Sequence, residues 1–290
     1  MDFLTLLSTS TPWLLITVGL FSLLVGSFLN VVIYRLPIIL ERQWKHDCTE
    51  LMGKNTDPLH EAPFNLVVPR SQCPTCGHAI TAWENIPIIS YLVLKGRCIS
   101  CQSPISVQYP AVEAITALLC VLAAWKFGYS IQLALFLPFT WTLVALFMID
   151  AKTMLLPDDL TLPLMWAGLV VNYYGVFTDL HSSVMGAAIG YLSVWSIFWL
   201  FKLLTGKEGM GYGDFKLLAA LGAWGGWAIL PFVIFGASAF GAVFGLVWMA
   251  LNRQKTSTPL PFGPWLVMAG WVAVFWLQPI THTTLGYIFP

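Results

Sequence analysis

Charged side chains are scarce in this sequence. Asp, Glu, Lys and Arg make up only 10% of its 290 residues, whereas hydrophobic residues make up 58%. Soluble domains carry about 25% charged residues and roughly 45–50% apolar ones, so this composition cannot provide both a core and a wettable surface. It also excludes a disordered chain, a collagen-like chain and a small disulfide-stapled domain. The remaining class is a membrane protein whose chain crosses the bilayer several times.

Stretches without any charged residue run through most of the chain. They cover residues 3–34, 127–149, 160–178, 180–201, 217–252 and 256–290. A helix needs about 20 apolar residues to cross the hydrocarbon layer, and the long stretch 217–252 suffices for two crossings that turn near Gly225 and Gly226. With a further span over 109–127 and a last helix that starts near Pro264, we predict an all-α membrane protein with eight transmembrane helices. If 217–252 does not divide, the number is seven.

The predicted helices define three parts of the chain. Residues 1–34 form a first transmembrane helix, which we expect to be permanent because it lacks the basic start of a signal peptide and its apolar run is too long. Residues 35–107 form a small polar domain, and residues 108–290 form a domain of seven transmembrane helices.

The positions of Lys and Arg predict the orientation in the membrane, because these residues stay on the cytoplasmic side. The segment 35–107 holds seven of the 14 basic residues and is therefore predicted to be cytoplasmic. The other predicted inner loops carry Lys152, Lys202, Lys207, Lys216, Arg253 and Lys255. Both termini then lie on the far side, where Lys126 is the exception to the rule. A bacterial-type inner membrane is the natural setting for this topology.

Four of the six cysteines form two pairs in the polar segment, Cys73 with Cys76 and Cys98 with Cys101. Two intervening residues let both sulfurs of a pair converge on one metal ion, and four thiolates make the closed tetrahedral shell of structural zinc. Gly77 follows the first pair and Gly96 precedes the second, where each permits the positive φ that such turns often need. The cytoplasm is reducing, so disulfides are not expected. A redox pair or simple reduced thiols are the alternatives.

The two remaining cysteines and three of the histidines are not expected to bind metal. Cys120 lies in a predicted span and is expected to pack, and Cys48 is expected to be a free thiol. His46, His60 and His78 are possible substitute ligands but are expected to be solvated. The polar segment carries seven basic and six acidic residues, a balance of +1, which is too small to indicate binding of nucleic acid.

Two acidic residues lie at the ends of apolar stretches, where a carboxylate is costly and usually functional. The predicted topology puts Asp150 at the cytoplasmic end of the third span and Asp214 at that of the sixth. Two facing carboxylates can share one proton, so that one activates water while the other polarises a carbonyl. In the alternative interpretation Asp214 only caps a helix, and Asp150 pairs with Lys152 or Lys216.

Other acidic residues compete for a functional role. Asp158 and Asp159 follow Pro157 just before a span, and we expect them to cap that helix. Glu113 lies inside a span and either pairs with a polar group or binds substrate. Glu208 follows Lys207 in a loop and is expected to be solvated.

Several motifs together resemble those of the type IV prepilin peptidases. The segment 211–216, Gly-Tyr-Gly-Asp-Phe-Lys, looks like the GxGD motif of membrane aspartic proteases. The segment 26–37, the two Cys pairs, and the sequences Met-Ile-Asp at 148–150 and Leu-Pro-Asp at 156–158 complete the pattern in the order of the family. GxGD alone would be weak, because presenilin-type enzymes share it, but the cysteine segment makes the resemblance specific.

The resemblance implies a bifunctional inner-membrane enzyme that contacts the lipid bilayer. It would remove the basic leader from prepilins and from type II secretion pseudopilins at the cytoplasmic face, with Asp150 and Asp214 as the catalytic aspartates of the domain 108–290. It would then N-methylate the new N-terminal residue with S-adenosylmethionine, and its zinc ligands would be Cys73, Cys76, Cys98 and Cys101. The sequence contains no Gly-rich Rossmann unit that would mark the methyl-donor site, and we expect that site in 35–107.

Two other classes of protein remain as alternatives. A proton-coupled transporter would use the two acids as a proton relay and would have repeated halves, but no internal repeat is visible. A membrane methyltransferase without protease activity would not need two acids at one membrane level.

Overall fold

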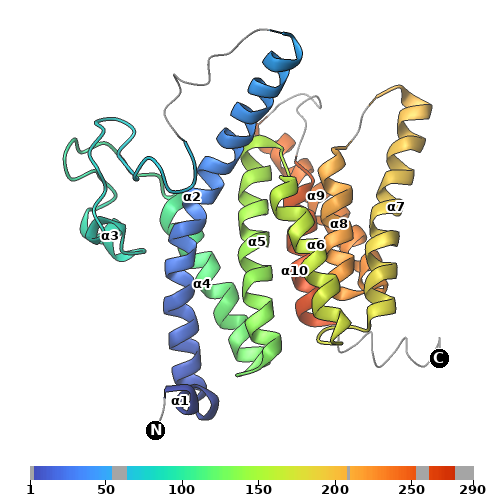
Figure 1. The fold of residues 1–290 in the computed structure, drawn as a ribbon, viewed down its shortest axis with the longest axis horizontal. Coiled ribbons are helices and arrows are strands. Elements are labelled where there is room, and N and C mark those ends of the chain that lie inside the picture. The colour runs from blue at the N-terminus through green and yellow to red at the C-terminus, as the bar shows by residue number, and fades with distance from the viewer. Residues whose placement is uncertain (1–2, 54–63, 208–209, 253–260, 278–290) are drawn as a thin grey trace. The chain divides into compact units, whose positions relative to one another are not determined.

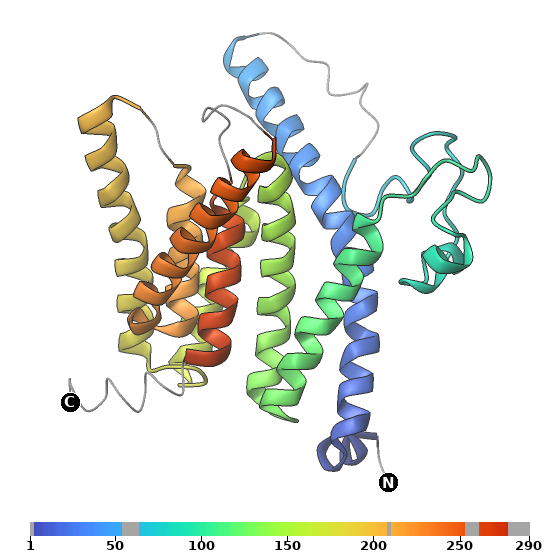
Figure 2. The same cartoon turned by 180° about the vertical axis from the view of Figure 1, so that it is seen from behind.

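The computed structural model describes residues 3–53, 64–207, 210–252 and 261–277, and the chain divides into two compact units, 1–133 and 134–290. The described residues are mostly helical and contain no β-strand, only two isolated β-bridges. Figures 1 and 2 show the helices from opposite sides. The predicted all-α class is therefore confirmed for the described part of the chain.

The first unit is built on two long helices that pack against each other. The short helix α1 (Phe3–Thr9) precedes α2 (Thr11–Leu51), and α4 (Gln108–Phe127) lies beside α2. Gly26 permits this close contact, because a Cβ atom there would come within 2.8 Å of a backbone atom of α4, the Cα of Glu113. Helix α2 extends well beyond residue 34, so the first part of the predicted polar domain is a continuation of the first helix.

A small domain with little regular structure connects α2 to α4. Its described part, residues 64–107, contains only the 3₁₀ turn η2 (Trp83–Asn85) and the five-residue helix α3 (Ile89–Val93). Both lie in the predicted polar segment, whose residues 54–63 are outside the described part. The domain therefore needs other means than a hydrophobic core to fix its chain path.

The second unit is a bundle of antiparallel helices. They are α5 (Ile131–Thr153, of which residues 131–133 belong to the first unit), α6 (Asp158–Tyr173), α7 (Leu180–Thr205), α8 (Tyr212–Gly225), α9 (Leu230–Asn252) and α10 (Gly263–Val272). A 3₁₀ turn, η3 (Trp227–Ile229), precedes α9, and a π-helical turn, η4 (Ala273–Leu277), follows α10. In both views the helices run alternately up and down, so the end of α5 and the starts of α8 and α10 lie at one end of the unit.

Helix α8 is the central helix of this unit. Nearly all of its residues are buried, and α6, α7 and α10 pack around it. Gly186 of α7 and Gly222 of α8 touch backbone to backbone, so that a Cβ atom on either would collide with the other. Trp224 fills the space between α8 and α5, where its ring lies 4.7 Å from that of Phe139. Small residues at the contact of two membrane helices let the backbones approach closely.

The buried C-terminal end of α8 is satisfied by side chains from its neighbours. Asn172 donates to the carbonyl oxygens of Ala223 and Trp224 at 2.7 and 3.0 Å, and the hydroxyl of Ser183 donates to Ala223. Helix ends leave carbonyl groups without intrahelical partners, and in an apolar surrounding each one is costly. Gly226 then turns the chain with φ +78°. The predicted division of residues 217–252 near Gly225 and Gly226 is confirmed.

Among the described residues, five helices are long and apolar enough to cross a membrane, namely α2, α4, α5, α7 and the helix of residues 227–250. The other helices of the second unit are shorter, with 16 residues in α6, 14 in α8 and 10 in α10. At 1.5 Å per residue, α8 is about 21 Å long, less than the hydrocarbon thickness of about 30 Å. Its polar ends are tolerated because surrounding helices cover them. The last helix starts at Gly263, next to the predicted Pro264.

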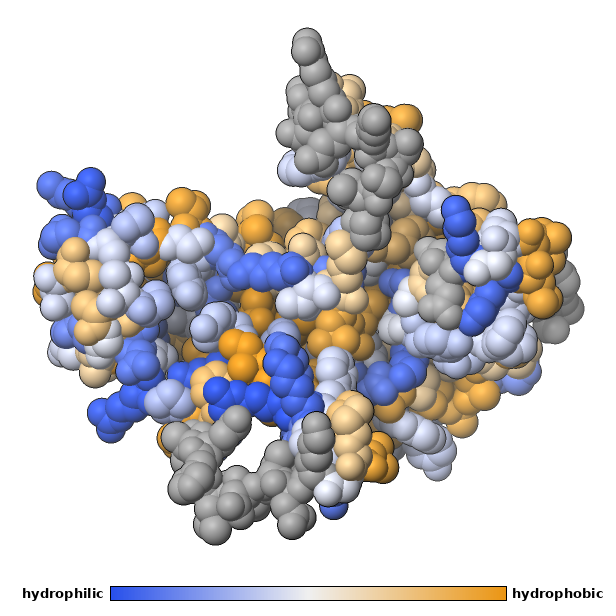
Figure 3. Space-filling model, turned by 90° about the horizontal axis from the view of Figure 1, so that it is seen from above, coloured by the Kyte–Doolittle hydropathy of each residue, from blue (hydrophilic) through white to orange (hydrophobic). Residues whose placement is uncertain are grey.

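Apolar side chains also point outward from the helices. On α9, Phe235, Phe240 and Leu246 are exposed, with 75% of Phe235 accessible. Exposed apolar surface of this kind marks contact with a membrane or a partner. Seen from above the view of Figure 1, the surface shows hydrophilic side chains beside hydrophobic ones (Figure 3).

Candidate functional site

Asp150 lies in the last turn of α5, buried among its neighbours with 5% of its surface accessible. The backbone N–H of Gly263, at the start of α10, faces its carboxylate. The carboxylate oxygen Oδ2 has no hydrogen-bond partner among the described residues. A buried acceptor without a partner is rare in folded proteins and needs an explanation, such as a ligand or a water molecule at this position.

Asp214 lies in the first turn of α8 and is also buried, with 7% accessible. The backbone of Gly211 lies beside its carboxylate. Gly213 is packed against Leu156, since a Cβ atom on Gly213 would come within 2.7 Å of the leucine side chain. The glycines of this motif therefore let the start of α8 approach the loop between α5 and α6.

Asp150 lies at the end of α5 and Asp214 at the start of α8, and these two helix ends lie at the same end of the second unit (Figure 1). Two carboxylates that face each other can hold a single proton between them. Asp214 is not the N-cap residue of α8, which is Gly211, but its carboxylate faces the backbone of Gly211 from the first turn, a contact that also occurs in helix capping. Lys216 pairs with Asp158 at 2.7 Å rather than with Asp150.

The expectation that Asp158 and Asp159 cap α6 is wrong. Pro157 occupies the N-cap position, and no side chain caps this helix. Asp158 is instead the partner of Lys216 on α8, whose ammonium donates to both carboxylate oxygens. Asp158 forms this ion pair rather than a cap because α6 and α8 are packed side by side. The local sequence does not reveal that contact.

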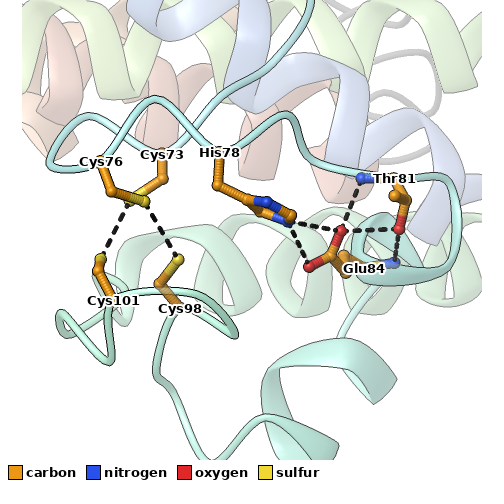
Figure 4. A network of polar contacts seen from close by, with 7 residues as sticks. All are labelled: Cys73, Cys76, His78, Thr81, Glu84, Cys98 and Cys101. Carbon is orange, nitrogen blue, oxygen red and sulfur yellow. Dashed lines mark hydrogen bonds and ion pairs between the residues drawn. The ribbon is translucent and has the colours of Figure 1, made fainter.

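The four paired cysteines come together in the first unit (Figure 4). All four sulfur atoms lie within 4.8 Å of one another. The sulfur of Cys73 lies 3.8 Å from that of Cys101, and the sulfur of Cys76 lies 4.0 Å from that of Cys98. Four sulfurs about 2.3 Å from a central zinc ion are about 3.8 Å apart in a regular tetrahedron. The cluster therefore fits the size of a zinc ion.

The two cysteine pairs have the same backbone geometry. The N–H of Cys73 donates to His78 O and that of Gly77 to Cys73 O, both at 2.9 Å. In the second pair the N–H of Cys98 donates to Ser103 O at 2.9 Å, and that of Gln102 to Cys98 O at 3.0 Å. A β-bridge closes each loop. Gly77 and Gly96 have the expected positive φ, but Gln102, in the position equivalent to Gly77, also has φ +60°.

The surroundings of the cluster favour the thiolate, the form that binds metal, at two of the four cysteines. The backbone N–H groups of Cys76 and Thr75 lower the pKa of the Cys73 thiol to about 6, and Ser103 lowers the pKa of Cys101 through its hydroxyl and its backbone. The backbone of His78 lowers the pKa of Cys76, but burial and the neighbouring thiols of the cluster outweigh it and raise that pKa to about 11. The geometry therefore fits a tetrahedral site, and a bound cation would hold all four sulfurs deprotonated.

His78 is not a ligand of this cluster, nor is it solvated as expected. Its Nε2 atom lies 3.0 Å from a carboxylate oxygen of Glu84, and Thr81 donates to the same carboxylate through its N–H and its hydroxyl (Figure 4). These contacts hold the pKa of Glu84 below its usual value, with the Thr81 backbone as the largest cause. The spacing Thr-x-x-Glu is that of a capping box, and this pattern in the sequence could have predicted the contact between Thr81 and Glu84. Of the other histidines, His46 is exposed and His60 lies outside the described residues.

Glu113 of α4 binds the small domain. One of its carboxylate oxygens accepts a hydrogen bond from the N–H of Ile88 at 2.8 Å, which confirms that it pairs with a polar group. Ile88 has φ +60°, a conformation that is unfavourable for a branched side chain. This contact attaches the segment before α3 to the helices of the first unit. Cys120 is buried in α4, as expected, and Cys48 is exposed near the end of α2.

Together these features define a membrane protein with two buried carboxylates at helix ends in one unit and a four-cysteine cluster in the other. Residues 20–127 match the Bacterial Peptidase A24 N-terminal domain, and residues 137–246 match the Type IV leader peptidase family. The chain belongs to the type IV leader peptidase family. No solved structure matches it.

Relatives cover nearly the whole chain. A prepilin leader peptidase/N-methyltransferase of Pseudomonas aeruginosa is 54% identical over 268 residues, 92% of each chain. One of Aeromonas hydrophila is 54% identical over 279 residues, 95% of this chain and 96% of the relative. One of Legionella pneumophila is 47% identical over 277 residues, with the same coverage.

Proposed function

We propose that this protein is a bifunctional membrane enzyme that removes the leader from prepilins and N-methylates the new N-terminus. The names of its relatives support both activities. The observation that carries the protease is the pair Asp150 and Asp214, two buried carboxylates from different helices at one end of the second unit. Type II secretion pseudopilins, whose leaders have the same chemistry, are the second class of substrate.

The two aspartates hydrolyse the peptide bond by general acid–base catalysis. One carboxylate is ionised and takes a proton from water, which attacks the scissile carbonyl. The other is protonated and donates its proton toward the carbonyl oxygen as negative charge develops there. When the tetrahedral species collapses, the first carboxyl passes its proton to the leaving nitrogen, the C–N bond breaks, and the second carboxylate recovers its proton as the carbonyl of the product re-forms. The unpartnered Oδ2 of Asp150 is free to accept the hydrogen bond of that water. The proton belongs to the pair as a whole, and no covalent acyl intermediate forms.

Of the glycines near the aspartates, Gly211 has open space beside it, because a Cβ atom there would meet nothing closer than 3.8 Å. Gly213 and Gly263 are instead filled by Leu156 and by Asp150 itself, so that they bring backbone close to the two carboxylates. A prepilin would place its apolar helix in the bilayer beside the second unit, with its basic leader in the cytoplasm. Its scissile segment would then lie between the two carboxylates.

Zinc in this proposal has a structural role. Cys73, Cys76, Cys98 and Cys101 hold the ion and fix residues 64–107, which have too little regular structure to be stable alone. Closed four-thiolate sites leave no open position for substrate. The hydrolysis therefore depends on the aspartates and not on the metal.

S-adenosylmethionine supplies the methyl group in the second reaction. This assignment rests on the N-methyltransferase activity in the names of the relatives. We place the site in the small domain and its supporting helices, the first unit of the chain. The functional division predicted from the sequence, a first helix (1–34), a zinc domain (35–107) and a protease domain (108–290), belongs to the same proposal with two changes, since the first helix continues to Leu51 and α4 packs in the first unit.

The membrane setting in this proposal is the bacterial inner membrane, crossed eight times. Beside the five long helices, α6, α8 and α10 would each cross once, which matches their alternating directions in the second unit. The end of the unit that holds the aspartates would then face the cytoplasm, as the distribution of Lys and Arg predicts.

A single experiment separates this proposal from the alternatives. The detergent-solubilised protein is incubated with a prepilin and S-adenosylmethionine, and the products are analysed by mass spectrometry. We expect loss of the leader followed by gain of one methyl group. Methylation of a pre-cut substrate without any cleavage would indicate a methyltransferase alone. An unchanged substrate would leave a proton-coupled transporter as the better hypothesis.

A further inference from the structure

The first unit contains a cavity of about 500 Å³ that neither aspartate borders. Helix α2 and the start of α4 form one wall, and the loops of the small domain form the other. Small-molecule sites typically measure about 300–1,000 Å³ and combine apolar walls with a few polar groups. This cavity has that size, and its lining combines apolar residues with many polar ones, among them Arg35 and the carboxylates of Glu84 and Glu113.

A buried cation lies in the wall of this cavity. Arg35 of α2 has 7% of its surface accessible, and its guanidinium donates to the carbonyl oxygens of Asn65 at 2.9 Å and Pro69 at 2.6 Å. Within the described part of the chain no carboxylate pairs with it. Five N–H donors are available on a guanidinium, and a buried charge is normally compensated by an opposite one. Arg35 is thus suited to bind an anionic group in the cavity.

A buried acceptor without a partner lies one and a half turns earlier on the same helix. Asn30 is 5% accessible and lines the cavity, and its Nδ2 donates to Tyr109 O at 3.1 Å and to Gly26 O at 3.3 Å. Its Oδ1 atom has no hydrogen-bond partner among the described residues. Buried polar atoms are rarely left unpaired. A ligand that donates a hydrogen bond, such as an ammonium group, would satisfy it.

Aromatic rings complete the lining. The side chains of Tyr34, Tyr91 and Tyr109 border the cavity. Aromatic faces bind flat nucleobases by stacking. The cavity thus combines a site for an anion, a site for an ammonium group and a wall for a ring.

We propose that this cavity binds S-adenosylmethionine, with its carboxylate on Arg35, its α-ammonium on Asn30 Oδ1 and its adenine against the tyrosines. An amino acid joined to a purine nucleoside is the ligand whose groups match all three features. The N-terminus of a cut pilin offers an ammonium group but no neighbouring carboxylate, so it would leave Arg35 uncompensated. The inference rests on the proposed methyltransferase function and gives that function a site.

Binding to the purified, zinc-loaded full-length protein tests this assignment by isothermal titration calorimetry. The two probes are S-adenosylhomocysteine, which keeps the amino acid, and 5′-methylthioadenosine, which lacks it. We expect Arg35→Gln to weaken the binding of S-adenosylhomocysteine roughly tenfold or more, because a charged hydrogen-bonded pair is lost. The affinity for 5′-methylthioadenosine should stay within about twofold of the wild-type value. Arg35→Lys should restore part of the affinity for S-adenosylhomocysteine.

A matched control is Arg42→Gln, which removes a charge from the same helix at a residue that does not line the cavity. It should bind both probes like the wild type. An equal loss of affinity for both probes in Arg35→Gln, or no loss of affinity for either probe, would overturn the assignment. So would binding of a pilin N-terminal peptide, in place of S-adenosylhomocysteine, that depends on Arg35.

A methyl-transfer assay of the wild type separates a failure of the cavity assignment from a failure of the proposed methyltransferase function. If the wild type transfers methyl groups but S-adenosylhomocysteine binds independently of Arg35, only the cavity assignment fails. If the wild type transfers none and does not bind S-adenosylhomocysteine, the methyltransferase function fails with it.

Discussion

Gly263 faces the carboxylate of Asp150, and only a glycine fits there. A Cβ atom on Gly263 would come within 2.5 Å of Oδ2 and 2.9 Å of the carboxyl carbon of Asp150. The two residues are far apart in the sequence, yet the start of α10 and the end of α5 meet at this point. The backbone of Gly263 thus forms one wall of the proposed active site.

Substitution of Gly263 by alanine is expected to reduce leader cleavage about a hundredfold, because small displacements of catalytic groups have effects of this size. The added methyl group must push the Asp150 carboxylate away from its position. Initial rates of prepilin cleavage in detergent measure the effect. Gly236→Ala on α9 is the control, since its Cβ would make only a 3.4 Å contact with Ala269. Wild-type cleavage by Gly263→Ala would contradict the geometry proposed for the site.

Each aspartate is expected to be essential for cleavage. Asp150→Asn and Asp214→Asn should each lower the cleavage rate by more than about a thousandfold, because residues that act as a unit fail together. The double variant should be no worse than either single one. Methylation of a pre-cut substrate should persist in all three, which also shows that they are folded. A single variant that processes prepilin at nearly the wild-type rate would remove that residue from the mechanism.

The sequence indicated Asp150 and Asp214 as candidates because each lies at the end of a long apolar stretch, where a charge is conspicuous, and the structure buries both of them at helix ends. It also predicted the turn at Gly226, since two adjacent glycines in a run long enough for two helices favour a break there. Gly263 could not be found in this way. Its role depends on a contact between α5 and α10, and nothing in the surrounding residues indicates that contact.

The structure also differs from the sequence-based prediction at Asp158 and at the end of α2. The ion pair of Asp158 with Lys216 joins residues 58 positions apart, so local capping rules gave the wrong role for Asp158. Helix α2 continues to Leu51 although its last part, residues 41–51, is mostly polar, because helix formation does not require an apolar surrounding. Cysteine spacing, in contrast, predicted the four-thiol cluster correctly, since the ligands of each pair lie within a single turn.

The zinc site is expected to hold one ion per chain and to lose it in acid. The pKa of the Cys73 thiol is lowered to about 6, so the thiolate is present above this value and is lost as the pH falls through it. Zinc binding itself holds ligands deprotonated, and release should therefore occur at or below about pH 6. Zinc content after dialysis across a pH series measures this.

Loss of the ion should destabilise the small domain without directly stopping hydrolysis. Cys73→Ser and Cys101→Ser should purify without zinc and should be cleaved faster by an added protease within residues 64–107. Cys48→Ser, an exposed thiol outside the cluster, is the control and should keep its zinc. A metal-free protein that is equally resistant to proteolysis would contradict a structural role for the cluster.

The two ends of α7 are expected to lie on opposite sides of the membrane. His181 and Thr205 are both exposed, near the start and the end of this helix. The 24 residue steps between them correspond to about 36 Å, more than the hydrocarbon thickness of about 30 Å. Because both residues belong to one helix, the test does not depend on how the parts of the chain are arranged.

Single cysteines at these positions report the orientation by labelling in intact cells. Cys48 and Cys120 are replaced, the four clustered cysteines are kept, and this background without an added cysteine is the control. We expect His181→Cys to react with impermeant reagents from outside and Thr205→Cys to react only with permeant ones, because Lys202 and Lys207 hold the second end in the cytoplasm. The start of α8 follows Thr205 after six residues, so the same result would place Asp214 at the cytoplasmic face. Labelling in the reverse sense would leave the aspartates on the wrong side for a leader that the same charge rule keeps in the cytoplasm, and the proposed cleavage would then be impossible at this site.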